Sequence, residues 1–245
     1  NVDLAVGAVT ADKVVSNTFW QMTGNAGITA GTHFIGTTDD RPVEIYANNQ
    51  RVLRLDNSFT MPNITIGEPN NAINPNAGSA TISGGGGLGG GNPNRVTDNY
   101  GTIGGGAGNV VGDDGGSVFS AEYGTVGGGK VNTAGAEYAT VAGGATNVAS
   151  GEYSFVGGGL NNRAEGPWST VLGGIENVAT NEQSVIGGGS LNRTDAASSV
   201  IAGGGRNHIA KGSTSATISG GSINYITNSL SSVIAGGHQS RIYDS

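Results

Sequence analysis

An aromatic side chain recurs at regular steps in the first half of a repeated stretch of this chain, at Tyr123, Tyr138, Tyr153 and Trp168, with Tyr100 upstream. If residues one such step apart are neighbours in adjacent turns of a repeating structure, their rings form an outward column with a spacing of about 5 Å. Such a column could stack against a sugar or a partner protein, as a binding site does. Ring contacts of this kind also stabilise neighbouring strands by themselves, so a purely structural role is the alternative.

Other residues with chemical potential show no catalytic or metal-binding spacing. Acidic residues either repeat at one point of the unit or lie near an insertion: Glu137, Glu152, Glu182, Asp98, Asp113 and Asp114. A calcium site needs six to eight converging oxygens, which this spacing does not supply. The histidines at positions 33, 208 and 238 have no motif spacing, and the Gly-Gly-Gly runs lack the Lys-Ser or Lys-Thr of a phosphate loop. We therefore expect a non-enzymatic protein with no catalytic residue, cofactor or metal.

The unit that carries these residues begins with an aliphatic residue, which we number position 1. It returns at a fixed fifteen-residue interval between Val126 and Ile201. An eight-residue insertion around residues 113–119 separates Ile103 from Val126, and the last two spacings are 17 and 16. The sequence therefore predicts ten units, whose position-1 residues are Leu88, Ile103, Val126, Val141, Val156, Val171, Ile186, Ile201, Ile218 and Ile234.

Two kinds of residue define the unit. Positions 3 and 4 are glycine in all ten units, and position 7 is Asn in nine, with Ser240 as the exception. Paired glycines suit a corner where φ is positive or backbones approach closely. An Asn at one point of every coil can stack on its neighbours and pass side-chain amide hydrogen bonds along the column. A unit of this length accommodates two short strands and two turns, so we predict an all-β fold, a parallel β-solenoid or β-roll of about ten coils.

Composition agrees with this fold and narrows the function. With 47 Gly, 12% charged and 6% aromatic residues among 245, the chain has too few large apolar side chains for an ordinary globular core. A formal net charge of −7 with dispersed basic residues gives no surface for nucleic acid or an anionic membrane. Cysteine is absent and no long apolar run occurs. Because the chain starts at Asn1 rather than Met, we expect an exported, extracellular or cell-surface protein whose signal peptide has been removed.

Three segments precede the repeats. Residues 1–19 are an N-terminal strand segment, in which residues 1–9 alternate apolar side chains and residues 14–19 are a second possible strand. Residues 20–61 are predicted as a small β domain with a hairpin at 43–55. Residues 62–87, which contain three prolines and end in a glycine run, are predicted as a linker into the β-roll of residues 88–245.

The register of the hairpin follows from which pairing sorts its two faces. A two-residue turn at Asn48 and Asn49 would place Val43 opposite Arg54. A three-residue turn that includes Gln50 instead pairs Val43 with Leu55, Ile45 with Leu53 and Glu44 with Arg54. We predict the three-residue turn, because it places apolar residues opposite apolar ones.

The units, for example TVAGGATNVASGEYS at residues 140–154, resemble the head repeats of trimeric autotransporter adhesins, which are left-handed parallel β-rolls built from three chains. The period differs, since those heads mostly use a repeat one residue shorter, and so does the doubled glycine. The preceding segment, residues 20–56, resembles a cassette found before such repeats in large secreted bacterial proteins and in tail-fibre-like proteins. The resemblance implies a structural or adhesive role and favours a homotrimer, and it carries no catalytic residues.

These observations predict an extracellular structural protein that forms a surface fibre or adhesive filament. Each coil buries only a small aliphatic core and the chain has no disulfide, which favours a homo-oligomer. Residues 1–9 could add to the open edge of the next copy and so give a head-to-tail polymer. The alternative is an adhesin or tail-fibre head that binds a glycan or protein receptor through residues 123, 138, 153 and 168. An ice-binding solenoid needs an unbroken Thr row, and position 15 breaks it at Phe155 and Val185.

Overall fold

The structure is a computed structural model that describes residues 26–57, 61–87 and 91–243 of the chain. The chain divides into two compact units, Asn1–Asp39 and Asp40–Ser245. In the first unit, residues 26–39 form turns and bends, and the backbone N–H groups of Thr32 and His33 both donate to the carbonyl oxygen of Thr29. The strands expected in residues 1–19 lie outside the described residues.

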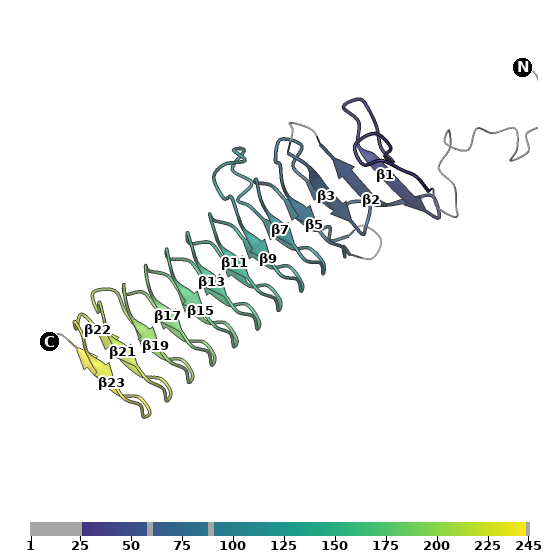
Figure 1. Ribbon diagram of the computed structural model, residues 1–245. Helices are drawn as coiled ribbons and strands as arrows, with labels where there is room; N and C mark the ends of the chain where they lie inside the picture. Colours follow the sequence, from purple (N-terminus) through teal and green to yellow (C-terminus); the bar gives the residue numbers. More distant parts are fainter. Residues whose placement is uncertain (1–25, 58–60, 88–90, 244–245) are drawn as a thin grey trace, which may run out of the picture. The chain divides into compact units, whose positions relative to one another are not determined.

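The second unit is all-β and contains a parallel β-solenoid of about 12 turns from residue 64 onward, which confirms the predicted fold class. Figure 1 shows successive strands stacked along the coil. The first sheet has 13 strands, in spatial order β1 (Val43–Ala47), β2 (Gln50–Asp56), β3 (Asn63–Ile66), β5 (Thr81–Ile82), β7 (Thr102–Ile103), β9 (Thr125–Val126), β11 (Thr140–Val141), β13 (Phe155–Val156), β15 (Thr170–Val171), β17 (Val185–Ile186), β19 (Val200–Ile201), β21 (Thr217–Ile218) and β23 (Val233–Ile234).

The second sheet has 11 strands on the other side of each coil. In spatial order they are β24 (Arg241–Tyr243), β22 (Tyr225–Thr227), β20 (His208–Ile209), β18 (Arg193–Thr194), β16 (Val178–Ala179), β14 (Arg163–Ala164), β12 (Val148–Ala149), β10 (Thr133–Ala134), β8 (Val110–Val111), β6 (Arg95–Val96) and β4 (Ala72–Ile73). From β3 onward each strand pairs with the strand two further along the chain, so every coil contributes one strand to each sheet.

Neighbouring coils pair in strict register. Val141 lies opposite Val126 in the preceding coil and opposite Val156 in the following one, as the regular period predicts. Position 1 in the first sheet and position 9 in the second both point inward, and Val141 and Ala149 are 0% exposed. The core is therefore a narrow double row of small and medium aliphatic side chains that a single chain fills.

The corner of each coil depends on the glycine at position 4. From Gly106 to Gly237 these glycines have φ between +82° and +113°. A Cβ added to Gly144 would lie 2.3 Å from the carbonyl oxygen of Gly159 in the next coil, so the two backbones touch there. A Cβ on Gly143, at position 3, would meet nothing within 4 Å. The two positions look alike in the sequence, but the close approach is at position 4.

The Asn residues at position 7 form a buried column, as predicted, whose hydrogen bonds run mainly from side chain to backbone. Asn162 Nδ2 donates to the carbonyl oxygen of Gly158 in its own coil at 2.9 Å and to that of Gly174 in the next coil at 2.8 Å. Asn162 Oδ1 accepts the backbone N–H of Asn177 at 3.0 Å. Each amide therefore satisfies the corner of its own coil and joins that coil to the next.

Residues 62–87 are not a linker but the first coils of the solenoid, which corrects the predicted domain boundary. Strand β3 pairs in parallel with β5, β5 with β7, and β4 with β6. Ile82, rather than the predicted Leu88, occupies position 1 in the coil before Ile103. The step from Ile82 to Ile103 is longer than the regular period, and this irregular length together with the prolines concealed the two coils in the sequence.

The hairpin has the predicted strand pairs but not the predicted turn. Val43 lies opposite Leu55, and Ile45 lies opposite Leu53. Beyond Ile45 the register shifts by one residue, and Ala47 pairs with Gln50. The turn therefore has two residues, Asn48 and Asn49, with φ of 48° and 60°, values that Asn tolerates and that the tight hairpin turn requires. A bulge at Val52 supplies the extra residue that the predicted three-residue turn was meant to supply.

The hairpin covers the N-terminal edge of the first sheet. Strand β2 runs antiparallel to β3, so the first coil pairs with a strand of opposite direction. Arg51 Nη2 donates to the carbonyl oxygen of Pro69 at 2.6 Å, and Arg51 Nη1 lies 3.5 Å from a carboxylate oxygen of Glu44. A groove of about 930 Å³ is lined by the hairpin and by the first coils. Arg51 therefore ties the hairpin to the solenoid within one unit.

Candidate functional site

The structure brings the four predicted binding residues together in one stacked column on the surface. The ring centroids of Tyr123 and Tyr138 are 4.9 Å apart, those of Tyr138 and Tyr153 are 4.6 Å apart, and those of Tyr153 and Trp168 are 5.8 Å apart. Tyr100 extends the column at 4.6 Å from Tyr123. Neighbouring rings are parallel to within 9°, so each ring lies face to face with the next.

The stacking limits what this aromatic column can bind. The rings emerge from left-handed turn positions, with φ of 56° at Tyr138 and 53° at Trp168, and the two side chains are 39% and 51% exposed. Because each inner ring has a neighbour on both faces, only ring edges and phenol hydroxyls meet solvent. A sugar that stacks on an aromatic face would find none free between Tyr123 and Tyr153. The column therefore offers a row of hydroxyls rather than a stacking platform.

The surroundings of two tyrosines in the column, Tyr123 and Tyr153, favour the protonated form of their hydroxyls. Partial desolvation raises the pKa of Tyr123, and the neighbouring Tyr100 and Glu122 add to that effect. Desolvation likewise raises the pKa of Tyr153, with further contributions from Tyr138 and Glu137. An ordinary tyrosine is already neutral at physiological pH, so these phenols act as hydrogen-bond donors and acceptors and not as bases.

The acidic residues near the insertion are held by protein groups. Asp98 is 1% exposed, and its Oδ2 accepts from Thr97 Oγ1 at 2.8 Å and from the backbone N–H of Asp113 at 3.2 Å. Its Oδ1 accepts the backbone N–H of Ala121 at 3.2 Å and Ser120 Oγ at 3.3 Å. Asp98 thus fastens the insertion to the coil. Among the described residues, no group of three or more His, Cys, Asp or Glu side chains is placed to hold a metal ion.

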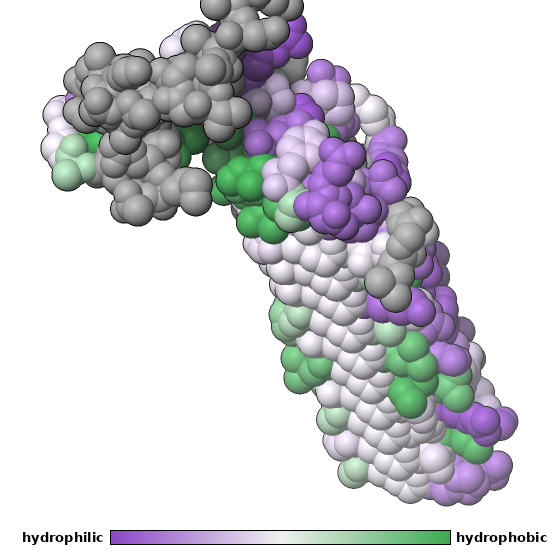
Figure 2. Space-filling model, turned by 90° about the vertical axis from the view of Figure 1, so that its right-hand side faces the viewer, coloured by the Kyte–Doolittle hydropathy of each residue, from purple (hydrophilic) through white to green (hydrophobic). Residues whose placement is uncertain are grey.

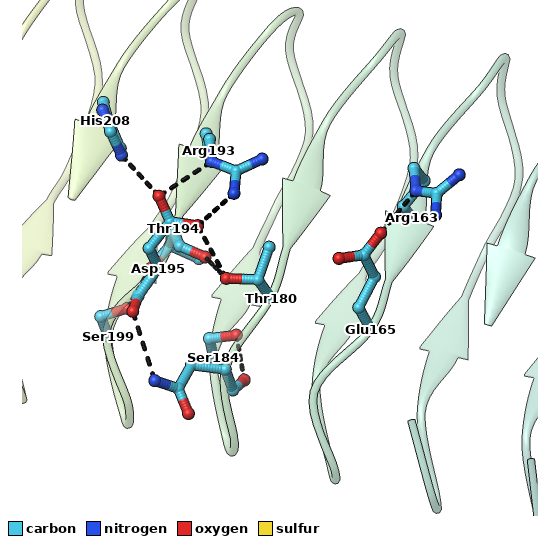
Figure 3. Close-up of polar contacts among 10 residues, drawn as sticks. Arg163, Glu165, Thr180, Ser184, Arg193, Thr194, Asp195, Ser199 and His208 are labelled. Carbon is cyan, nitrogen blue, oxygen red and sulfur yellow. Dashed lines mark hydrogen bonds and ion pairs between the residues drawn. The ribbon is translucent and has the colours of Figure 1, made fainter. Parts of the chain in front are cut away.

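Asp195 is the centre of a polar network that the sequence pattern did not indicate. Its carboxylate lies 2.6 Å from Arg193 Nη2 and 2.9 Å from His208 Nε2, and it accepts Thr180 Oγ1 at 2.7 Å (Figure 3). Partial burial opposes ionisation, but the hydrogen bonds from Arg193, Thr180 and His208 outweigh it and lower the pKa of Asp195. The other two histidines lie outside this network. His33 Nδ1 accepts the backbone N–H of Thr29, and His238 Nδ1 shares a hydrogen bond with Ser222 Oγ.

Exposed apolar side chains also gather on the solenoid. Figure 2 shows a strip of near-neutral hydropathy along one face of successive coils, with hydrophobic clusters beside it. Leu160 and Ile175, which are bridge partners in neighbouring coils, are 46% and 49% exposed. Leu191, whose backbone N–H donates to the carbonyl oxygen of Ile175, is exposed as well. Apolar surface that continues from coil to coil is typical of a contact surface.

A pocket of about 280 Å³ lies near the last described coil and was not predicted. It is lined by Arg206, Ile223, Asn224, Tyr225, Arg241 and Tyr243. These residues come from coils whose spacing departs from the regular period and from several coil positions, so no single column of the repeat reveals them. The feature of the sequence that points to this region is a lack of acidic residues, since residues 196–243 contain no Asp or Glu.

A scan against protein-family models gives no match to this sequence, and a search of curated proteins gives none either. Within the described residues, no helix is long and apolar enough to cross a membrane. The fold and the surface features above are therefore the basis for any assignment of function.

Proposed function

We propose that this chain is a non-enzymatic extracellular structural protein that forms the shaft of a surface fibre or adhesive filament. The observation that carries the proposal is the unbroken register of the solenoid, in which each coil hydrogen-bonds to the next. Phe155, for example, donates its backbone N–H to Ser169, and Thr170 donates to Ser184, in successive coils. A stack of about 12 coils at about 4.8 Å each gives a rod of roughly 60 Å from a single chain.

Electron microscopy of native, negatively stained material tests this proposal. Rods at least as long as the stack, joined into fibres on the cell surface or shed from it, are the expected result. Isolated particles that never assemble and a protein retained inside the cell would contradict it. The localisation and the assembly are separate readouts, so each part of the proposal is tested by itself.

We further propose that copies associate with one another, either end to end or as a trimer. The coils keep their register as far as β24, which pairs in parallel with β22 and is the end strand of the second sheet among the described residues. Residues 1–9, which lie outside the described residues, supply an alternating strand that could pair with such an edge. Deleting residues 1–9 shortens the filaments if this strand joins copies. If filament length is unchanged, residues 1–9 do not join the copies. The edge at β24 is then better explained as the place where further coils of a longer protein would pair.

Lateral association has its own support and its own test. The exposed apolar side chains of Leu160 and Ile175 lie in neighbouring coils, where a second copy could cover them. Sedimentation equilibrium should therefore give a mass above the 24.2 kDa of one chain. The double change of Leu160 and Ile175 to Asp should return the protein to the monomer mass. A wild-type monomer at all concentrations would contradict the trimer.

Receptor binding by the aromatic column is the second candidate function. The parallel stack of Tyr123, Tyr138, Tyr153 and Trp168 on the surface favours it, because the hydroxyl edges of the three tyrosines form a regular row that a glycan or protein could contact. A glycan array with the wild type and with Tyr138→Phe, which keeps the ring but removes the hydroxyl, tests this candidate. Equal binding by the two proteins would leave the column with its structural role alone.

A further inference from the structure

Arginines on the outer face of the second sheet follow a pairing rule in the middle of the solenoid. Arg163 and Arg193 both occupy position 8, and each is paired with an acidic residue two positions later. Arg163 Nε lies 2.6 Å from Glu165 Oε1, and Arg193 Nη2 lies 2.6 Å from Asp195 Oδ1 (Figure 3). The carboxylate neutralises the guanidinium within its own coil, so these arginines have little charge to offer a ligand.

The last described coil breaks this rule. Arg241 begins β24 as Arg193 begins β18, but the residue two positions later is Tyr243, and Arg241 Nη1 donates to its hydroxyl at 3.1 Å. Between residues 196 and 243 the sequence contains Arg206, Lys211 and Arg241 but no Asp or Glu, and the next acidic residue, at position 244, lies outside the described residues. In the part of the chain that the structure describes, neither Arg206 nor Arg241 has an ion-pair partner.

The two unpaired guanidinium groups line the same pocket of about 280 Å³, together with Tyr225 and Tyr243. The centroids of the two tyrosine rings are 6.4 Å apart and the rings are tilted by 49°, so they are not stacked face to face. His208 meets Tyr225 at 73°, edge to face, and so occupies at most one side of that ring. This arrangement differs from the aromatic column, in which the inner ring faces are stacked. Asn224, which also lines the pocket, is buried, and its side-chain amide already donates to the carbonyl oxygens of two corner glycines.

We propose that this pocket binds an acidic sugar unit of a glycan, through its carboxylate or sulfate group. A guanidinium presents N–H donors in a planar fork that matches such an oxyanion, and the rings of Tyr225 and Tyr243 in the pocket lining offer apolar surface to the C–H groups of a sugar ring. The volume suits one monosaccharide. The inference goes beyond the shaft function, and only the choice of a glycan as the ligand rests on the proposed surface location.

Nucleic acid is the competing anionic ligand, and the charge distribution disfavours it. Affinity for a phosphate backbone grows with the number of cations that track it, and this end of the solenoid carries three in a chain of net charge −7. A pocket with two arginines and two tyrosines instead selects one anionic group together with the apolar ring that carries it.

Isothermal titration with three tetrasaccharides tests the proposal on the full chain. Hyaluronan supplies a carboxylate, heparin supplies sulfate, and chitotetraose is the neutral probe of the same length; a decathymidylate oligonucleotide serves as the nucleic-acid probe. Binding of at least one acidic sugar at least tenfold more tightly than chitotetraose is expected, and the preferred acid identifies the group. No acidic preference, or tighter binding of the oligonucleotide than of either sugar, would overturn the proposal.

Variants locate the binding to the pocket. Arg241→Ala and Arg206→Ala should each weaken binding of the preferred sugar at least tenfold, and Arg241→Lys, which keeps the charge but loses the planar fork, should weaken it less. Arg163→Ala, which removes a paired arginine at the same coil position, should leave the affinity within twofold. Equal losses for Arg163→Ala and Arg241→Ala would show that overall charge, and not this pocket, binds the sugar. If only the pocket is lost, the variants should still form rods in electron micrographs. A failure of the sugar-binding proposal is therefore distinguishable from a failure of the proposed shaft function.

Discussion

Asn147 Oδ1 accepts the backbone N–H of Asn162 at 2.9 Å, one full coil further along the chain. The same contact recurs between Asn162 and Asn177 and between Asn177 and Asn192, at 3.0 Å in both cases. A backbone N–H that is buried at a corner must find an acceptor, and here the acceptor is a side chain from the preceding coil. The Asn column therefore fixes the stacking of coils as directly as the strands do.

Asn162→Ala removes three hydrogen-bond partners at once, those for Gly158, Gly174 and the N–H of Asn177. Leaving buried backbone groups unsatisfied should lower the free energy of unfolding by about 1–3 kcal/mol. Glu152→Ala, an exposed change beside the column of rings, is the matched control and should cost little. Chemical denaturation of both variants measures the difference, and equal shifts would mean that the Asn column does not hold the coils together.

The two corner glycines should respond differently to the same substitution. Gly144→Ala places a methyl group 2.3 Å from the carbonyl oxygen of Gly159 at a φ of +87°, so the coils must separate locally. Gly143→Ala adds the same methyl group where nothing lies within 4 Å. We expect a clear drop in melting temperature for Gly144→Ala and little change for Gly143→Ala. A Gly144→Ala protein as stable as Gly143→Ala would contradict the close approach at position 4.

Two buried serines differ in whether their hydroxyls are satisfied. Ser169 Oγ is buried without a hydrogen-bond partner, and the buried Ala139 occupies the same coil position two coils earlier, so a methyl group fits there. Ser169→Ala should raise the free energy of unfolding by roughly 1 kcal/mol, because an unpaired buried hydroxyl is removed. Ser199 Oγ instead contacts Thr194 Oγ1 and donates to the carbonyl oxygen of Ala196 at 2.7 Å, so Ser199→Ala should be destabilising. Shifts of the same sign in both variants would refute this distinction.

The Asp195 network predicts a dependence of stability on pH. Its pKa in the folded protein is lowered below the ordinary value of 3.8, so the ionised carboxylate favours folding. This contribution is fully present above 3.8 and is lost as the pH falls through the lowered folded value. The melting temperatures of the wild type and Asp195→Asn should therefore differ at neutral pH and converge in strong acid. A difference that stays constant down to strong acid would show that Asp195 acts without its charge.

The regular part of this fold could be predicted from the sequence because stacked coils need equal lengths. Val126, Val141 and Val156 must lie opposite one another, and a constant period follows directly from that requirement. The coils at residues 62–87 break the period with an insertion after Ile82, so the same reasoning assigned them to a linker. The bulge at Val52 leaves no mark in the residue pattern either, because a register shift exchanges one acceptable pairing for another.

The candidate sites also differ in how far the sequence could predict them. Tyr123 and Tyr138 could be found from spacing alone, since residues at one position of the unit form a column. Their spacing could not reveal that the stacked faces are closed to ligands. Arg206 and Arg241 could not be linked by spacing, because they occupy different coil positions in irregular coils. Such a pocket becomes visible only when the coils are placed in three dimensions.

In this structure one chain forms every complete coil by itself and stacks the coils in register. The chain has no cysteine, so two introduced cysteines carry the only spin labels. Mixing the labelled protein with excess unlabelled protein prevents interactions between spin labels on different copies. Lys130 is bridged to Ser190 through four successive coil steps and to Ser222 through six. Electron–electron dipolar spectroscopy should give narrow distances near about 19 Å for Lys130→Cys with Ser190→Cys and about 29 Å for Lys130→Cys with Ser222→Cys. Broad distributions, or two distances that do not differ by about two coil spacings, would contradict the in-register solenoid.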